Sequence, residues 1–168
     1  MHRILAGFAL PIMGIHGLTH WARVLENGLA LAAKTGANRD VVTLFAVFHD
    51  ARRRNEGRDS GHGMRGAQLA MELREDHIDL TDKEFELLAE ACAYHTNGRT
   101  QADLTVRCCW DADRLDLWRV GTIPRDELLC THAAMDEDFK RWAMNRSQSL
   151  FTPDIVRNEW LPLAEGRR

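Results

Sequence analysis

Helical periodicity is the feature that most constrains the fold of this chain. From about Leu18 to Lys34, apolar residues recur three to four positions apart, and Gly36 follows as a stop signal. The next stretch begins near Asn38 or Asp40 and runs to residues 49–50. It is apolar on nearly every face, as expected of a buried central helix. No convincing run of alternating strand residues is present in the sequence. The pattern therefore predicts an all-α fold.

The remaining helices are predicted from capping and stop signals. After a polar loop over residues 53–61, a third helix is expected from about His62 to Arg74. Thr81 and Glu84 form a capping-box pattern that opens a fourth helix, ending near residue 95. A fifth is expected from Leu104 to Val120, and shorter ones after residue 124 and over 133–145 and 153–161. With no linker or repeat, residues 1–168 are expected to form a single-domain helical bundle of about six to eight helices.

Composition excludes several classes of protein. A net charge of -3 gives no reason to expect a nucleic acid duplex or an anionic membrane as partner. The four cysteines lack CxxC spacing, which favours reduced thiols over a cysteine-ligated zinc site. The apolar N-terminal stretch is interrupted by Pro11 and Gly14, does not resemble a signal peptide, and is too short to span a bilayer. We therefore expect a cytoplasmic protein.

The residues that indicate chemistry are histidines and carboxylates at helix ends. His49 and Asp50 close an otherwise apolar helix, so both side chains should lie at the rim of the core. A histidine nitrogen and a neighbouring carboxylate oxygen can bind one divalent cation if other helices supply further ligands. His20 and Asp113 are the natural donors, because an ionised Asp113 inside an apolar helix needs a cation or hydrogen bonds to offset burial. Three acids at 111, 113 and 116 cannot all face one side of a helix, so at least one should point inward.

These residues resemble the pattern of the HD superfamily of metal-dependent phosphohydrolases. The matching segments are HGLTHWARV with His20, LFAVFHDARR with His49 and Asp50, and WDADRLDL with Asp113. The resemblance runs from about residue 16 to residue 120. It implies a helical HD core at about 16–121 with a C-terminal helical extension at 122–168. It also implies the four metal ligands His20, His49, Asp50 and Asp113, with Asp113 preferred to Asp111.

Two more histidines fit the larger family pattern. His62 stands where the third helix begins and His95 where the fourth ends, positions at which some members hold a second metal. In other members such histidines contact the substrate phosphate, and both alternatives stay open. The cofactor implied is one or two divalent ions, with Mn, Fe, Mg, Co, Ni and Zn as candidates.

The resemblance implies hydrolysis of a small phosphorylated substrate, with a nucleotide as one candidate. Asp50, or a nearby carboxylate such as Glu56, would accept the proton of the attacking water. Arg114 resembles a basic residue that contacts phosphate in related nucleotidases. Arg53 and Arg65 are expected to bind phosphate from the arginine cluster that follows the His-Asp pair. His16 is a weaker candidate for the same pocket.

Two better-known activities fit poorly. The Gly-Tyr-Pro motif of cyclic-dinucleotide phosphodiesterases is missing after His95, and arginines stand where alarmone hydrolases carry an acidic pair. Phosphomonoesterase and phosphodiesterase activity both remain open, as do monomer and homodimer. The competing hypothesis is a metal- or nucleotide-binding HD sensor with little or no turnover.

Overall fold

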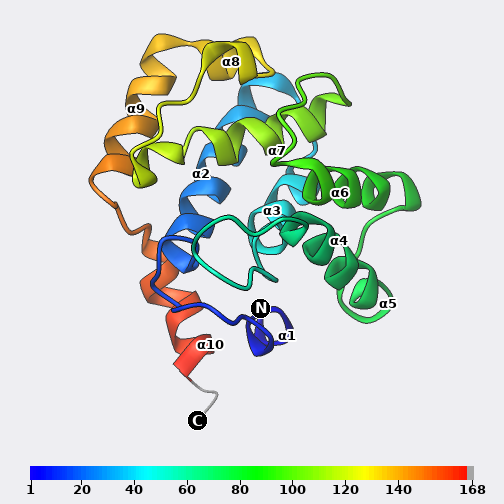
Figure 1. The fold of residues 1–168 in the computed structure, drawn as a ribbon. Helices are drawn as coiled ribbons and strands as arrows, with labels where there is room; N and C mark the ends of the chain where they lie inside the picture. Colours follow the sequence, from blue (N-terminus) through cyan, green and yellow to red (C-terminus); the bar gives the residue numbers. More distant parts are fainter. Residues whose placement is uncertain (166–168) are drawn as a thin grey trace.

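The computed structural model describes residues 1–165, and the regular elements of this part of the chain are all helices, without strands (Figure 1). The all-α prediction is confirmed. In chain order the elements are α1 (His2–Ala6), α2 (Leu18–Thr35), α3 (Arg39–Phe48), α4 (His62–Glu72), α5 (Arg74–His77), α6 (Asp82–Tyr94), α7 (Leu104–Arg114), η1 (Leu117–Val120), η2 (Asp126–Leu128), α8 (His132–Met135), α9 (Glu137–Gln148), the π-helical turn η3 (Val156–Trp160) and α10 (Leu161–Glu165).

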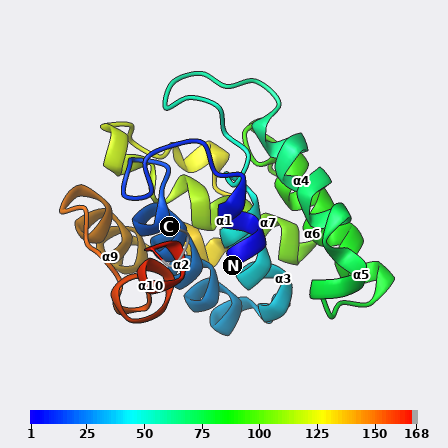
Figure 2. The same cartoon turned by 90° about the horizontal axis from the view of Figure 1, so that it is seen from below.

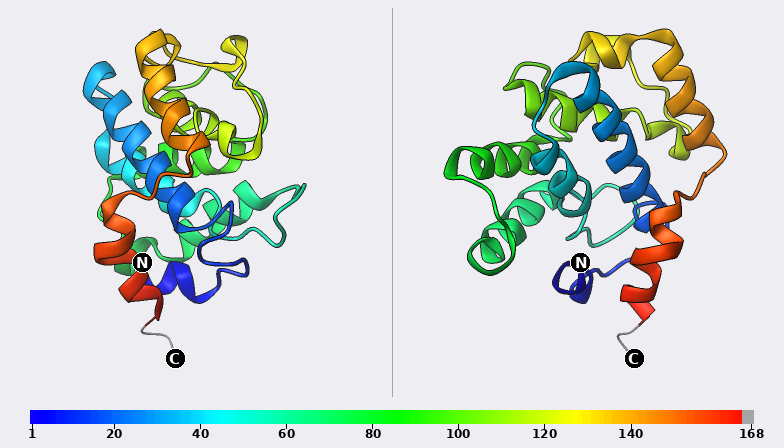
Figure 3. Two further views of the ribbon diagram at one scale, coloured as in Figure 1. Left: turned by 90° about the vertical axis from the view of Figure 1, so that its left-hand side faces the viewer. Right: turned by 180° about the vertical axis from the view of Figure 1, so that it is seen from behind.

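Helix α3 forms the centre of the bundle. It packs against α2, α6 and α7, and its side chains Phe45 and Phe48 are almost completely buried. Helices α4 and α6 lie side by side on one flank (Figure 2). On the other flank α9, η3 and α10 follow the length of α2 (Figure 3). The histidines and carboxylates of the candidate site come from the inner ends of α2, α3, α4, α6 and α7.

Local signals account for the helix boundaries. The Asn38 side chain caps α3 by accepting from the backbone N–H groups of residues 40 and 41. Thr81 and Glu84 form the expected capping box at the start of α6. Gly36 ends α2 in the left-handed conformation, which glycine adopts without steric cost.

The structure corrects two of the expected helices. The fifth helix ends at Arg114 rather than Val120, and a short 3-10 turn, η1, replaces its last part. The chain turns there because the carboxylate of Asp116 points inward to Arg23, 2.7 Å from Nε. The helix expected over 133–145 is split at Asp136, whose side chain caps α9. With one-turn helices such as α1 included, ten α-helices lie within residues 1–165, more than the number expected.

Two further observations concern the whole described chain. The four cysteines are free thiols, three of them buried. None of the helices within residues 1–165 is both long and apolar enough to cross a membrane. The division into an HD core and a C-terminal extension at residues 121–122 stays a prediction.

Candidate metal centre

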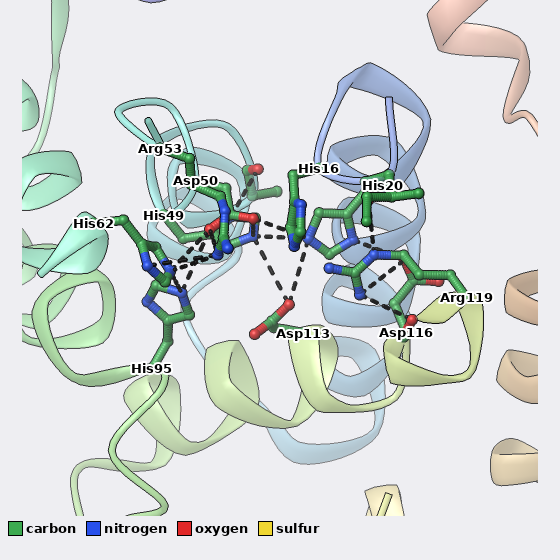
Figure 4. Close-up of polar contacts among 12 residues, drawn as sticks. His16, His20, His49, Asp50, Arg53, His62, His95, Asp113, Asp116 and Arg119 are labelled. Atoms are coloured by element: carbon green, nitrogen blue, oxygen red, sulfur yellow. Dashed lines mark hydrogen bonds and ion pairs between the residues drawn. The ribbon is translucent and has the colours of Figure 1, made fainter. Parts of the chain in front are cut away.

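Helices α2, α3 and α7 bring the four expected ligands together (Figure 4). His20 Nε2 lies 3.1 Å from His49 Nε2, 3.5 Å from Asp113 Oδ1 and 3.7 Å from Asp50 Oδ2. His49 Nε2 lies 3.8 Å from Asp113 Oδ1. The side chains of His20, His49 and Asp50 are buried, and that of Asp113 is 14% exposed. We call these four residues the first ligand group.

A second group forms around the other oxygen of Asp50. His62 begins α4 and His95 follows α6, and their Nε2 atoms approach to 2.9 Å. Asp50 Oδ1 lies 3.1 Å from His62 Nε2 and 3.7 Å from His95 Nε2. We call Asp50, His62 and His95 the second ligand group. Asp50 therefore joins the two groups, one through each carboxylate oxygen.

The four histidines of the two ligand groups are each fixed in orientation by a contact at Nδ1. Nδ1 of His20 lies 2.7 Å from the Asp116 carboxylate, and Nδ1 of His49 lies 3.1 Å from the carbonyl of Ala46. Nδ1 of His62 lies 2.6 Å from the carbonyl of residue 59, and Nδ1 of His95 lies 2.8 Å from that of residue 92. Carbonyl and carboxylate oxygens only accept, so each Nδ1 carries the proton and donates. In the neutral rings Nε2 is then an unprotonated acceptor that faces the centre of the site.

This arrangement fits a divalent cation. Within each pair, His20 with His49 and His62 with His95, the two Nε2 atoms lie at hydrogen-bond distance, although in the neutral rings neither has a proton to donate. Asp50 Oδ1 is buried and accepts no hydrogen bond. A buried, unpaired acceptor is costly, and a cation between these atoms would satisfy all of them. Imidazole nitrogens with carboxylate oxygens form a donor set typical of Zn, Fe, Mn and related ions.

The pKa values of most of these side chains favour the protonation states that bind a cation. Burial raises the pKa of a carboxyl group, but the surrounding histidines outweigh burial and hold the pKa of Asp50 well below its usual range. The pKa of Asp113 is lowered for the same reason. Burial lowers the pKa of His49 to about 3, and burial with the nearby Arg119 charge lowers that of His20. Ionised carboxylates and neutral imidazoles are the protonation states that bind metal, and the first ligand group favours both. In the second ligand group, Asp50 and Asp113 outweigh burial and raise the pKa of His95.

Asp116 also lies at the site, although the sequence pattern did not single it out. Besides accepting from His20 Nδ1, its carboxylate is bound by Arg23 at 2.7 Å from Nε and 3.0 Å from Nη2. Burial would raise the pKa of Asp116, but the contacts with His20 and Arg23 lower it to about 2. The three acids at 111, 113 and 116 were the available signal. All three are engaged, since Asp111 accepts from the backbone N–H groups of residues 130 and 131.

His16 also reaches the site, although it was a weak candidate. Its side chain is buried ahead of α2, and its ring lies edge-on to that of His20 with centroids 6.1 Å apart. His16 Nδ1 lies 2.5 Å from Glu56 Oε2, so a histidine–carboxylate pair stands beside the first ligand group. Gly14 packs directly against Glu56, where a Cβ atom would clash with the carboxylate.

The three arginines expected to bind phosphate lie in different surroundings. Arg53 is at the site, with Nη1 3.2 Å from His62 Nε2 and 3.5 Å from Asp50 Oδ1. Arg65 instead forms a bidentate pair with Asp59, both contacts at 2.6 Å. Arg114 donates to the carbonyls of residues 99 and 128. The structure thus brings Arg53 to the ligand groups, while Arg65 and Arg114 bind other parts of the chain.

Comparison with known proteins identifies the family of this chain. The family model described as HD domain matches residues 17–118, more than half of the chain. This segment includes both ligand groups and Asp116. No curated protein and no solved structure matches the chain. The expected resemblance is confirmed, and the chain belongs to the HD domain family.

Proposed function

We propose that this protein is a metal-dependent phosphohydrolase that acts on a small phosphoester, with a nucleotide as one candidate substrate. The observation that carries the proposal is a pair of buried clusters joined by Asp50, His20–His49–Asp50 and Asp50–His62–His95, with Asp113 3.5 Å from His20. The two ligand groups together present four Nε2 atoms and two carboxylates, and Arg53 adds a fixed positive charge beside them. An anionic substrate bound to such a centre would be stabilised by charge as well as by coordination.

Each residue has a proposed role. His20, His49, Asp50 and Asp113 would hold the first cation, and His62 and His95 would hold a second cation with Asp50 or contact the phosphate. When bound, a divalent cation supplies a Lewis acid for the phosphoryl oxygen and lowers the pKa of the attacking water. Asp50 would orient that water and accept its proton, with the His16–Glu56 pair as the nearest alternative acceptor. Arg53 would bind a phosphoryl oxygen.

Metal analysis combined with a substrate screen tests this proposal. The purified protein is assayed for bound metal and then, with Mn²⁺, Mg²⁺, Co²⁺ or Ni²⁺, against a broad panel of phosphomonoesters and phosphodiesters. We expect bound metal in the wild type, its loss in His49→Ala and Asp50→Ala, and turnover of at least one phosphoester. His62→Ala separates the two roles of the second group, because it lowers the number of bound ions only if that group binds metal.

The exposed His77 on α5 offers a matched control. His77→Ala should keep the metal content and the turnover of the wild type. A wild type without metal, or a His49→Ala variant with unchanged metal content, contradicts the metal centre. Bound metal without turnover across the panel contradicts the hydrolase and favours the metal- or nucleotide-binding sensor.

A further inference from the structure

Arg119 carries a positive charge beside the first ligand group that neither the sequence pattern nor the family match assigns. Its side chain is 4% exposed. In Figure 4, Arg119 and Asp116 lie on one side of the site, and His62 and His95 lie on the other. Arg119 lies in η1, which begins directly after Asp116, whose carboxylate accepts from His20 Nδ1.

Two backbone carbonyls fix the guanidinium in place. Nε donates to the carbonyl of Ile15 at 2.8 Å, and Nη1 donates to the carbonyl of Asp116 at 2.9 Å. Ile15 directly precedes His16, so Arg119 connects the segment before α2 to the turn after α7. Within residues 1–165, Nη2 has no hydrogen-bond partner. A rigid guanidinium with unused donors is organised to bind an oxyanion without further loss of conformational entropy.

The positive charge of Arg119 is only partly compensated, because it shares its nearest carboxylate with two other side chains. Asp116 is the nearest acid, with Oδ2 3.7 Å from Nη1, but that carboxylate already forms a bidentate pair with Arg23 and accepts from His20. A buried charge whose one acidic partner is shared and 3.7 Å away is incompletely compensated. The repulsion is felt in the site, because the Arg119 charge contributes to lowering the pKa of His20. An anion bound beside the first ligand group would remove this cost.

The three arginines expected from the sequence to bind phosphate do not combine unused donors with a position beside the first ligand group. Arg65 is neutralised by Asp59, and Arg114 has both terminal nitrogens bound to backbone carbonyls. Arg53 lies beside the second ligand group, where Nη2 donates to the carbonyl of residue 57 at 2.6 Å. Arg119 and Arg53 therefore lie beside different ligand groups.

We propose that Arg119 binds a phosphoryl oxygen of the substrate beside the first ligand group, in the role expected for Arg114. The inference rests on the proposed phosphohydrolase function. It adds a binding residue that approaches the phosphoryl group from the side opposite to His62. Arginine suits this position because its fork-shaped donors match phosphate geometry.

Binding of inorganic phosphate to the metal-loaded protein tests the proposal by titration calorimetry. We expect Arg119→Gln to weaken phosphate binding at least tenfold, in line with the loss of one charge-assisted hydrogen bond of about 1.4 kcal/mol or more. Arg119→Lys keeps the charge and should restore part of the affinity, whereas a purely structural role for the guanidinium predicts no such rescue. Metal content should stay at the wild-type value in both variants.

Arg107→Gln is the matched control, since Arg107 also donates to a backbone carbonyl, that of Cys130, at 3.3 Å. It should leave the phosphate dissociation constant within about twofold of the wild type. If Arg119→Gln fails to fold, the Arg119→Lys and wild-type titrations at rising salt decide, because lysine should bind phosphate more weakly than arginine at each salt concentration. Equal affinity of wild type and Arg119→Lys in that series contradicts the proposal.

The outcomes separate this inference from the proposed function. Turnover of a phosphoester with a Michaelis constant unchanged in Arg119→Gln overturns the role of Arg119 and leaves the hydrolase intact. Phosphate binding that depends on Arg119, without turnover of any phosphoester, supports Arg119 and overturns the hydrolase. A wild type that binds no phosphate, or an Arg114→Gln variant that weakens phosphate binding while Arg119→Gln does not, overturns the inference.

Discussion

At the scale of single residues, Asp116 is the clearest case of a side chain that acts through another. Its carboxylate fixes the ring orientation of His20 through Nδ1 and neutralises the buried Arg23. Outer carboxylates of this kind raise the basicity of a histidine ligand, and their loss typically weakens metal binding by about 10–100-fold. We predict a loss of that size for Asp116→Asn, measured by competition with a metal-sensitive dye. Removing one partner of the buried pair should also lower the free energy of unfolding by about 3–5 kcal/mol.

Asp111→Asn provides the control for this prediction. Asp111 is equally buried on α7, but its carboxylate accepts from Cys130 and Thr131, away from the ligands. The substitution should destabilise the protein and leave metal affinity unchanged. If both variants bind metal as tightly as the wild type, Asp116 does not orient His20 in a way that matters for binding.

At the scale of helices, the second ligand group depends on how closely α4 approaches its neighbours. Gly66 faces the carbonyl of Phe48 and Gly63 faces that of Cys92, and at either position a Cβ atom would clash with backbone. Because His62 lies on the same helix, one turn before Gly66, the spacing of α4 from α3 decides whether His62 reaches Asp50. Two small residues thus allow the two ligand groups to share one carboxylate.

We predict that Gly66→Ala moves α4 outward and separates His62 from Asp50. Overpacking of this kind costs about 1–3 kcal/mol, which thermal unfolding would show. Metal analysis should show loss at the second group with the first group retained. Gly57→Ala is the comparison, since a Cβ there meets only the Asn55 side chain at 3.4 Å. Unchanged metal content in Gly66→Ala, under conditions where His62→Ala loses an ion, would show that α4 need not lie so close.

At the scale of the whole molecule, the buried histidines make the stability of the metal-free protein depend on pH. Burial lowers the pKa of His49 to about 3, below the value of about 6.5 in an unfolded chain, and also lowers that of His20 and His16. The folded state then binds fewer protons than the unfolded state, so stability is complete above pH 6.5 and falls on acidification. His95 opposes this trend, because Asp50 and Asp113 outweigh burial and raise its pKa.

We therefore predict that the chelator-treated protein is less stable at pH 5.0 than at pH 7.5, with about 2 kcal/mol of the difference due to His49. Urea unfolding at the two pH values measures it. His49→Gln removes the titrating group and should show a smaller difference. A metal-free protein that is equally stable at both pH values would contradict the prediction, because of the histidines with shifted pKa values only His95 opposes the trend.

The sequence by itself determined the helical class, most helix starts and which four residues to expect as metal ligands. Helix boundaries depend on local signals, such as the Asn38 cap and the Thr81–Glu84 capping box, which a sequence displays directly. The order of His20, His49, Asp50 and Asp113 carried the family resemblance, and the HD domain match confirms it.

Only the tertiary structure decided which arginines and acids lie beside the ligand groups. Arg114 and Arg119 lie five residues apart on neighbouring turns, yet one holds backbone carbonyls away from the ligands and the other lies beside His20's partner, Asp116. A long side chain is directed by the groups it meets, and for Arg119 one of these is the carbonyl of Ile15, 104 positions earlier in the chain. Periodicity in the sequence indicates which face of a helix is buried. Contacts between distant segments determine where the charged end of a long, buried side chain lies.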